Sequence, residues 1–289
     1  MSTAFRIAAA QYPIEQPRAW ADYETKIARW VGEAAAHGAR VLVFPEYFSM
    51  ELAALFAPEV QASLSQQIEA MQALLPGFLE HFSQLARQHG VLICAGTFPV
   101  RVDGVYRNRA HLLHADGRVE YQEKLQMTRF ENEVWGIARA DQLQVFDTAF
   151  GKLGIAVCYD AEFPLIARRM VEQGADVILV PSCTDTRAGY WRVRIGCQAR
   201  ALENQCYVVH SATVGTAPWS AAVDVNVGAA AIYTPVDRGF PDDGVLAVGT
   251  LNAAQWVYAD VDPANIARVR REGQVFNYRD WPAHTRLMP

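Results

Sequence analysis

Continuous apolar runs and helical patterns alternate along the first half of the chain. The short apolar runs have the composition of strands that are buried on both faces of a sheet. The longer segments between them carry large apolar side chains at helical spacing, and the second is interrupted near Pro76-Gly77. We therefore predict strands at 6–12, 40–44 and 91–98, and helices at 19–37 and 63–88.

The second half of the chain mixes hairpins with further strand–helix units. Asp116-Gly117 between two alternating segments is a strong signal for a β-hairpin. Such a mixture predicts an α/β fold with mixed sheets, and no linker divides it, so we predict one domain over residues 1–289. Strands are expected at 106–115, 118–123, 143–146, 152–159, 175–180, 206–211, 229–234, 245–251 and 255–261, and helices at 162–174, 190–204 and from about 263.

Composition narrows the classes of partner. The 289 residues are 51% hydrophobic and carry a formal net charge of -5, which gives no basic surface for nucleic acid or an anionic membrane. No apolar stretch reaches the length of a signal peptide or a membrane span, so we predict a cytoplasmic protein. Five cysteines without a pairing pattern argue against disulfides. We expect no metal, because His111 and His114 would face opposite sides of a strand.

Three polar residues stand near the ends of apolar strands, where α/β sheets bind their ligands. Glu46 follows Val-Leu-Val-Phe-Pro, Lys124 follows the second arm of the hairpin, and Cys158 ends Leu-Gly-Ile-Ala-Val. Each also has an ordinary interpretation, as a helix N-terminal carboxylate, a solvated charge and a small core side chain, respectively. Only three of the 26 basic residues are lysines, which favours a specific role for Lys124.

Together the three residues fit one mechanism. A cysteine nucleophile needs a base or a cation nearby, and Glu46 can supply the base. The ammonium of Lys124 can receive the negative charge that develops on a substrate oxygen. Segment 152–164 has the pattern of a strand, a tight turn and a helix, which exposes the thiol of Cys158 and directs the backbone N–H of Tyr159 at the same oxygen. No cofactor is required.

Several short segments, in a fixed order, carry a family resemblance: Phe44-Pro45-Glu46-Tyr47, Glu123-Lys124-Leu125, 154–160, Phe163-Pro164, 174–182 and 200–204. They resemble the nitrilase superfamily of carbon–nitrogen hydrolases over nearly the whole chain. The resemblance implies a four-layer αββα sandwich with mixed sheets and a Glu-Lys-Cys triad at Glu46, Lys124 and Cys158. It also implies a homodimer or higher homo-oligomer that pairs through helices, and we expect the C-terminal tail from about residue 263 to pack on the partner.

Many members of the superfamily carry a second glutamate shortly after the lysine. Glu131 and Glu133 are both candidates, and a surface carboxylate is the ordinary interpretation of either. We prefer Glu133, because its distance from Lys124 is closer to the family pattern.

The residues after the nucleophile indicate the branch. True nitrilases typically have Trp-Glu there, whereas Tyr159-Asp160 is more similar to amidase-like branches, which include ω-amidases. Segment 127–137 also resembles an uncharacterised subgroup that is sometimes fused to an acetyltransferase. We therefore predict hydrolysis of a small linear amide. A nitrile or carbamoyl hydrolase, or an idle relative that acts as a binding module, are the alternatives.

The segment after the strand at 175–180 is expected to form part of the acyl pocket. We predict that Tyr159, Cys183, Thr184 and Arg187 contact the substrate. Arg187, or alternatively Arg194, could bind a substrate carboxylate through two hydrogen bonds, although a solvated arginine on a helix is an equally good interpretation.

Overall fold

Burial of the first strand on both of its faces shows how the layers of the molecule form. In the computed structural model, which describes residues 4–285, β1 (Phe5–Pro13) places Ile7 and Ala9 in one hydrophobic cluster and Ala8 in another. Successive side chains of a strand point to opposite faces, so this strand is buried on both. One face lies against helices and the other against a second sheet.

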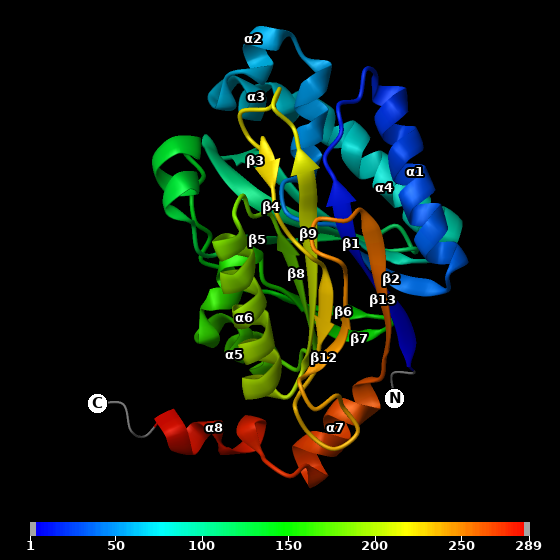
Figure 1. Cartoon of the computed structure of the whole chain (residues 1–289), viewed down its shortest axis with the longest axis vertical. Coiled ribbons are helices and arrows are strands. Elements are labelled where there is room, and N and C mark those ends of the chain that lie inside the picture. Colours follow the sequence, from blue (N-terminus) through cyan, green and yellow to red (C-terminus); the bar gives the residue numbers. More distant parts are fainter. Residues whose placement is uncertain (1–3, 286–289) are drawn as a thin grey trace.

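Helices α1 and α4 cover the outer face of the first sheet (Figure 1). Tyr23, Ile27 and Trp30 of α1 are buried in the cluster that this helix forms with the sheet. The strands run in the order β5-β4-β3-β2-β1, and β13 pairs with β1. The elements of this half are α1 (Trp20–Ala36), β2 (Ala39–Val43), η1 (Phe48–Leu55), α2 (Pro58–Gln61), α3 (Leu64–Met71), η2 (Gln72–Leu74), α4 (Leu75–His89), β3 (Leu92–Val102), β4 (Val105–Leu113), β5 (Val119–Glu123) and β13 (Gln255–Val261).

The second sheet continues from the C-terminal end of β1, where Gln11–Pro13 pairs with Ala212–Val214 of β9. Its strands run in the order β9-β8-β7-β6, and α5 and α6 cover its outer face (Figure 1). The elements of this half are η3 (Glu131–Trp135), β6 (Val145–Thr148), β7 (Gly151–Ile155), η4 (Cys158–Glu162), α5 (Pro164–Glu172), β8 (Val177–Ser182), α6 (Arg187–Asn204), β9 (Tyr207–Thr216), β10 (Val225–Asn226), β11 (Ala231–Tyr233) and β12 (Val245–Val248).

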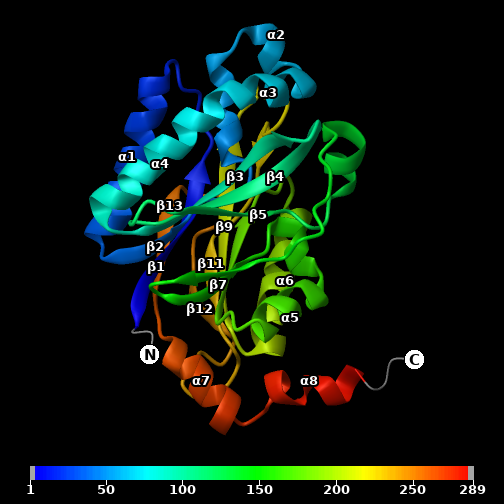
Figure 2. The same cartoon turned by 180° about the vertical axis from the view of Figure 1, so that it is seen from behind.

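The two sheets share one core. Val41 and Val43 of β2 belong to the same buried cluster as Ile155 and Leu179 of the second sheet. Helices therefore lie outside both sheets, with α1 and α4 on one side and α5 and α6 on the other, as the reverse view also shows (Figure 2). This arrangement confirms the predicted αββα sandwich with mixed sheets.

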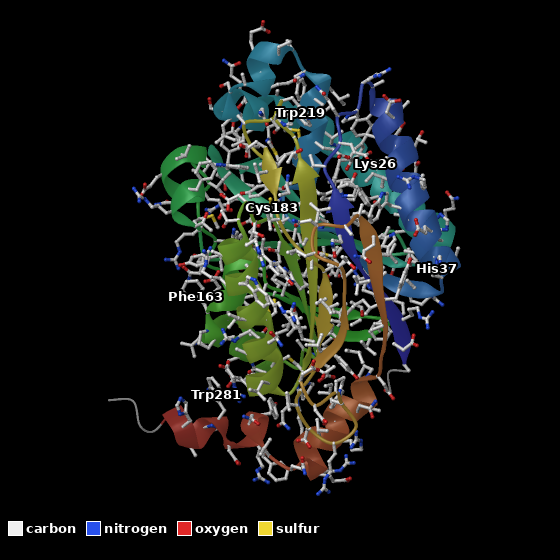
Figure 3. The ribbon with its side chains drawn as sticks, in the orientation of Figure 1. Lys26, His37, Phe163, Cys183, Trp219 and Trp281 are labelled. Atoms are coloured by element: carbon white, nitrogen blue, oxygen red, sulfur yellow. The ribbon has the colours of Figure 1, made fainter. Side chains whose placement is uncertain are left out.

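The C-terminal segment packs on its own chain through α7 (Pro263–Glu272) and α8 (Asn277–Thr285). The guanidinium of Arg168 in α5 lies 5.0 Å from the ring centre of Tyr278 and 5.1 Å from that of Trp281. Trp281 is labelled in Figure 3, beside α8. Packing of this segment on a partner subunit stays a prediction.

Several elements differ from the sequence pattern. The strand predicted at 152–159 ends at Ile155, and η1 was not anticipated. The helical break falls at η2, before Pro76, which occupies the first turn of α4, where a proline costs no helical hydrogen bond. Helix α8 was not anticipated, because its pattern is weak and it contains Pro282.

Within residues 4–285, no helix is long and apolar enough to cross a membrane. The same residues contain no group of three or more potential side-chain ligands for a metal.

Candidate active site

Glu46 lies at the C-terminal end of β2, in a turn that is fixed by the neighbouring strand. Tyr47 has a φ of 52°, and its backbone N–H donates to the hydroxyl of Thr97 at 2.9 Å. Gly96 of β3 has a φ of 53°, and a Cβ atom there would overlap the carbonyl oxygen of Pro45. Only glycine fits so close a contact at this φ. The pairing of β3 with β4 shifts between Cys94 and Thr97, which is a β-bulge. This bulge at Gly96 thus holds the turn of Glu46 in place.

Cys158 lies on the sharp turn between β7 and η4. Its φ of 48° is the left-handed conformation, which costs energy for a side chain other than glycine and is found at functional turns. The hydroxyl of Ser182 donates to its sulfur at 3.3 Å, and the sulfur lies 3.8 Å from the carbonyl oxygen of Cys183. The turn that segment 152–164 predicts is therefore present.

Lys124 follows β5 and is 1% exposed. Its Nζ atom donates to Oε1 of Glu46 at 2.8 Å and to Oε2 of Glu131 at 2.6 Å. Its ammonium group thus bridges two buried carboxylates. The structure brings Glu46, Lys124 and Cys158 together around one pocket.

The preference for Glu133 as the neighbour of Lys124 is wrong. The Glu133 side chain is 53% exposed and pairs with Arg129, whereas the Glu131 side chain is 4% exposed and contacts Lys124. The five-residue π-helical turn η3 directs Glu131 inward and leaves Glu133 on the outer side. Spacing along the chain does not reveal that orientation.

Three further side chains and one backbone N–H hold the two glutamates, and no pattern in the sequence indicated these roles. The amide nitrogen of Asn108 donates to Glu46 at 2.9 Å and to Glu131 at 3.2 Å. Glu131 also accepts hydrogen bonds from Tyr47 and Thr128. The backbone N–H of Cys183 donates to the other oxygen of Glu46 at 3.2 Å.

These surroundings shift the pKa values of all four groups of the site, which are Glu46, Glu131, Lys124 and Cys158. Burial raises the pKa of Glu46, although Lys124 opposes the shift. Burial would also raise the pKa of Glu131, but Lys124 and the hydrogen bonds lower it below its ordinary value. Burial alone would lower the pKa of Lys124, yet the two carboxylates raise it well above its ordinary value. Burial and Glu46 raise the pKa of the Cys158 thiol.

The four groups line a cavity of about 430 Å³. Tyr159, Cys183 and Thr184 also line it, and their contact with a substrate stays a prediction. The Thr184 hydroxyl, however, donates to the carbonyl oxygen of Val227 at 2.7 Å, so this hydroxyl is already bonded. Cys183 lies near the centre of the molecule in Figure 3.

The structure does not bring Arg187 to the cavity. Arg187 is exposed at the first position of α6 and is absent from the lining, and Arg194 instead donates to the hydroxyl of Tyr190. Arg129 and Arg192 line the cavity in its place. The direction in which a helix presents its arginines depends on how the helix packs, which the sequence alone left open.

Comparison with known proteins agrees with this fold. Residues 6–271 match the family model described as Carbon-nitrogen hydrolase. The protein is a hydrolase of the carbon–nitrogen hydrolase family, and this confirms the resemblance to the nitrilase superfamily.

Three relatives illustrate the similarity. The probable hydrolase YhcX of Bacillus subtilis is 36% identical over 275 residues, which are 95% of this chain and 53% of that protein. The chain thus spans about half the length of this relative. Human omega-amidase NIT2 is 25% identical over 287 residues, with 96% of this chain and 95% of NIT2 covered. The crystal structure of Saccharomyces cerevisiae Nit3, a nitrilase superfamily member, is similar in fold, with a TM-score of 0.73, 20% identity and 94% of each chain covered.

Proposed function

We propose that this protein hydrolyses a small linear amide to a carboxylate and ammonia through a thioester on Cys158. The observation that carries the proposal is the buried group of Glu46, Lys124, Glu131 and Cys158 at one pocket. The similarity to human omega-amidase NIT2 supports an amide over a nitrile. So does the Tyr159-Asp160 pair after the nucleophile.

The first half of the reaction transfers the acyl group to sulfur. The raised pKa of the thiol keeps Cys158 protonated at rest, so Glu46 takes the proton as the sulfur attacks the carbonyl carbon. The Lys124 ammonium and the N–H of Tyr159 stabilise the oxyanion, where one donor contributes about 3–4 kcal/mol. The C–N bond then breaks, and Glu46 returns its proton to the leaving ammonia.

The second half releases the product. Water attacks the thioester carbon while Glu46 takes a proton from it. The second oxyanion is held by the same donors, the C–S bond breaks, and Glu46 returns its proton to the sulfur. The products are the free thiol and a carboxylic acid, which ionises to the carboxylate in solution. Glu131 remains ionised throughout, because Lys124 and its hydrogen bonds lower its pKa, and it keeps Lys124 charged.

Ammonia release from a panel of ω-amides, short aliphatic amides, carbamoyl amines and nitriles tests the proposal. We expect turnover of amides by the wild type and a loss of at least about 1000-fold in Cys158→Ala. Cys206→Ala, which removes another buried thiol that does not line the pocket, is the matched control and should retain activity. No turnover and no acyl adduct on Cys158 by mass spectrometry would instead favour a binding module. Faster turnover of nitriles than of amides would contradict the assignment to an amidase-like branch of the superfamily.

We also propose that the enzyme is a homodimer that pairs through the outer face of α5 and α6. Four apolar side chains are exposed there, at fractions of 59% for Leu165, 44% for Trp191, 61% for Ile195 and 41% for Leu202. An apolar stripe of this kind on a helix favours a protein interface. Location in the cytoplasm also stays a prediction from the sequence.

Sedimentation analysis tests the dimer. Ile195→Asp places a charge in the middle of the stripe and should shift the wild-type dimer to a monomer at micromolar concentration. Val105→Asp, at an exposed valine of β4, is the control and should leave the dimer intact. A wild-type monomer, or a dimer that Ile195→Asp does not weaken, would contradict the proposed interface.

A further inference from the structure

Asp160 is a buried carboxylate that the proposed reaction does not use. It lies two residues after Cys158 in η4 and is 0% exposed. Its Oδ2 atom accepts a hydrogen bond from the backbone N–H of Val157 at 3.1 Å, and its Oδ1 atom accepts one from the N–H of Gln126 at 2.7 Å. The N–H of Leu125 lies 3.2 Å from both oxygens. No other acidic side chain is described with three backbone donors of this kind.

The donors come from two segments that each carry a reacting group. Leu125 and Gln126 directly follow Lys124, and Val157 directly precedes Cys158. Capping of η4 accounts only for the bond from Val157, which is the ordinary bond of a helix N-terminus. The bonds from Leu125 and Gln126 lie outside that role, because those residues are more than thirty positions away in the sequence.

We propose that Asp160 is a positioning residue that ties the segment of Lys124 to the turn of Cys158, and so sets the place of the ammonium group relative to the thiol and the oxyanion. The inference rests on the proposed amidase function. A carboxylate suits this position because it only accepts hydrogen bonds, at both oxygens. An amide of the same shape would turn an N–H₂ group toward an N–H group on one side.

Burial raises the pKa of Asp160 to about 7, while Lys124 and the three N–H groups oppose the shift. After burial, the charge of Lys124 is the largest influence on the pKa of this carboxyl. Lys124 and the three donors thus offset only part of the loss of solvation on burial, and they do so only while both segments stay in place. This supports the geometry, because an ionised Asp160 needs the two segments close together.

Asp160→Asn is the direct test. A displacement of Lys124 by a fraction of an ångström weakens oxyanion binding, so we expect kcat to fall about 100-fold with KM nearly unchanged. Lys124 also favours the Cys158 thiolate, so alkylation of Cys158 by iodoacetamide at pH 8 should slow about tenfold. Asp160→Glu keeps both acceptor oxygens and should recover about tenfold of the lost kcat.

Asp176→Asn is the matched control. Asp176 directly precedes β8, and its partly buried carboxylate pairs with Arg270. It thus lies at one end of β8, while Ser182, which contacts Cys158, lies at the other end. Its loss should lower the melting temperature and leave kcat and the alkylation rate unchanged. A folded Asp160→Asn enzyme with wild-type kcat and alkylation rate would overturn the inference, as would an Asp160→Glu enzyme no more active than Asp160→Asn.

Amide hydrogen exchange of the wild-type enzyme tests the link between Asp160 and the segment after Lys124, even if Asp160→Asn does not fold. Gln126 lies outside the helices and strands, and the acceptor of its N–H is Asp160. We expect exchange at Gln126 to be slowed at least about 100-fold relative to a free peptide. Exchange at the rate of a free peptide would overturn the tie. Because exchange and alkylation need no turnover, an inactive wild type would refute the proposed function and leave this test intact.

Discussion

At the residue scale, the site is a case of two carboxylates that share one cation but differ in basicity. Glu131 accepts hydrogen bonds from Lys124, Tyr47 and Thr128, and its pKa is lowered despite burial. Glu46 has fewer donors, and burial raises its pKa. Environments that separate the pKa values of a pair assign the roles of acid and base. This difference supports Glu46 as the group that exchanges protons in the proposed reaction, while Glu131 keeps its charge.

The two glutamates of the π-helical turn η3 give a matched pair of variants. Glu131→Gln removes the charge beside Lys124 and should lower kcat at least about 100-fold. Glu133→Gln changes an exposed ion pair with Arg129, which contributes little, and should leave kcat within about twofold. Steady-state kinetics on the best amide measures both. Equal losses in the two variants would contradict the assignment of Glu131.

At the element scale, the reacting side chains lie on turns at the ends of strands. Tyr47 and Cys158 both adopt positive φ angles, of 52° and 48°. Strained backbone of this kind persists only where the surroundings hold it. The bulge at Gly96 holds the first turn, and helix α6 holds the second, since Gly196 of α6 packs against the carbonyl oxygen of Ala161 in η4.

Gly96→Ala tests the support of the first turn. The substitution places a side chain at positive φ, which costs about 1–2 kcal/mol, and also forces it against Pro45. We expect a total loss of at least about 3 kcal/mol and reduced kcat. Gly90→Ala, with a φ of 64° and no atom within 4 Å of the added Cβ, isolates the cost of the φ angle at about 1 kcal/mol. Urea unfolding compares them, and equal losses would exclude a steric role for Gly96.

At the scale of the whole molecule, buried histidines link folding to pH. Burial lowers the pKa of His111 and of His210 to about 3, with Arg109 and Arg194, respectively, acting in the same direction. An unfolded histidine titrates near about 6.5, so the unfolded chain binds more protons between about pH 3 and 6.5. These histidines therefore contribute stability above about pH 6.5 that is lost progressively as the pH falls.

The variant His210→Gln separates the contribution of His210 to the pH dependence of stability from the contribution of the buried carboxyl groups. The difference in free energy of unfolding between wild type and His210→Gln should shrink as the pH falls from 7.5 to 5.5, because only the wild type must keep His210 neutral. One pH unit below about 6.5 changes that difference by roughly 1.4 kcal/mol. Urea unfolding at the two pH values measures it. A difference that does not depend on pH would show that His210 titrates normally in the folded state.

The α/β class and the candidate site residues could be predicted because local patterns encode them, whereas the four-layer order was implied by the family resemblance. Apolar runs marked the buried strands, Asp116-Gly117 marked the hairpin of β4 and β5, and polar residues at strand ends marked Glu46, Lys124 and Cys158. Each signal lies within a few residues of chain. The family resemblance joined these short segments into one fold.

The tertiary structure alone decided which side chains support the reacting groups. The contacts of Asn108 with two glutamates, and of Asp160 with residues after Lys124, join segments far apart in the sequence. The choice of Glu131 over Glu133 followed from the π-helical turn, since a shift of two positions there reverses the direction of a side chain. The sequence by itself thus indicated Glu46, Lys124 and Cys158 as the groups that we propose to react. Packing determined how they are held, because long-range contacts and side-chain direction arise only when the layers assemble.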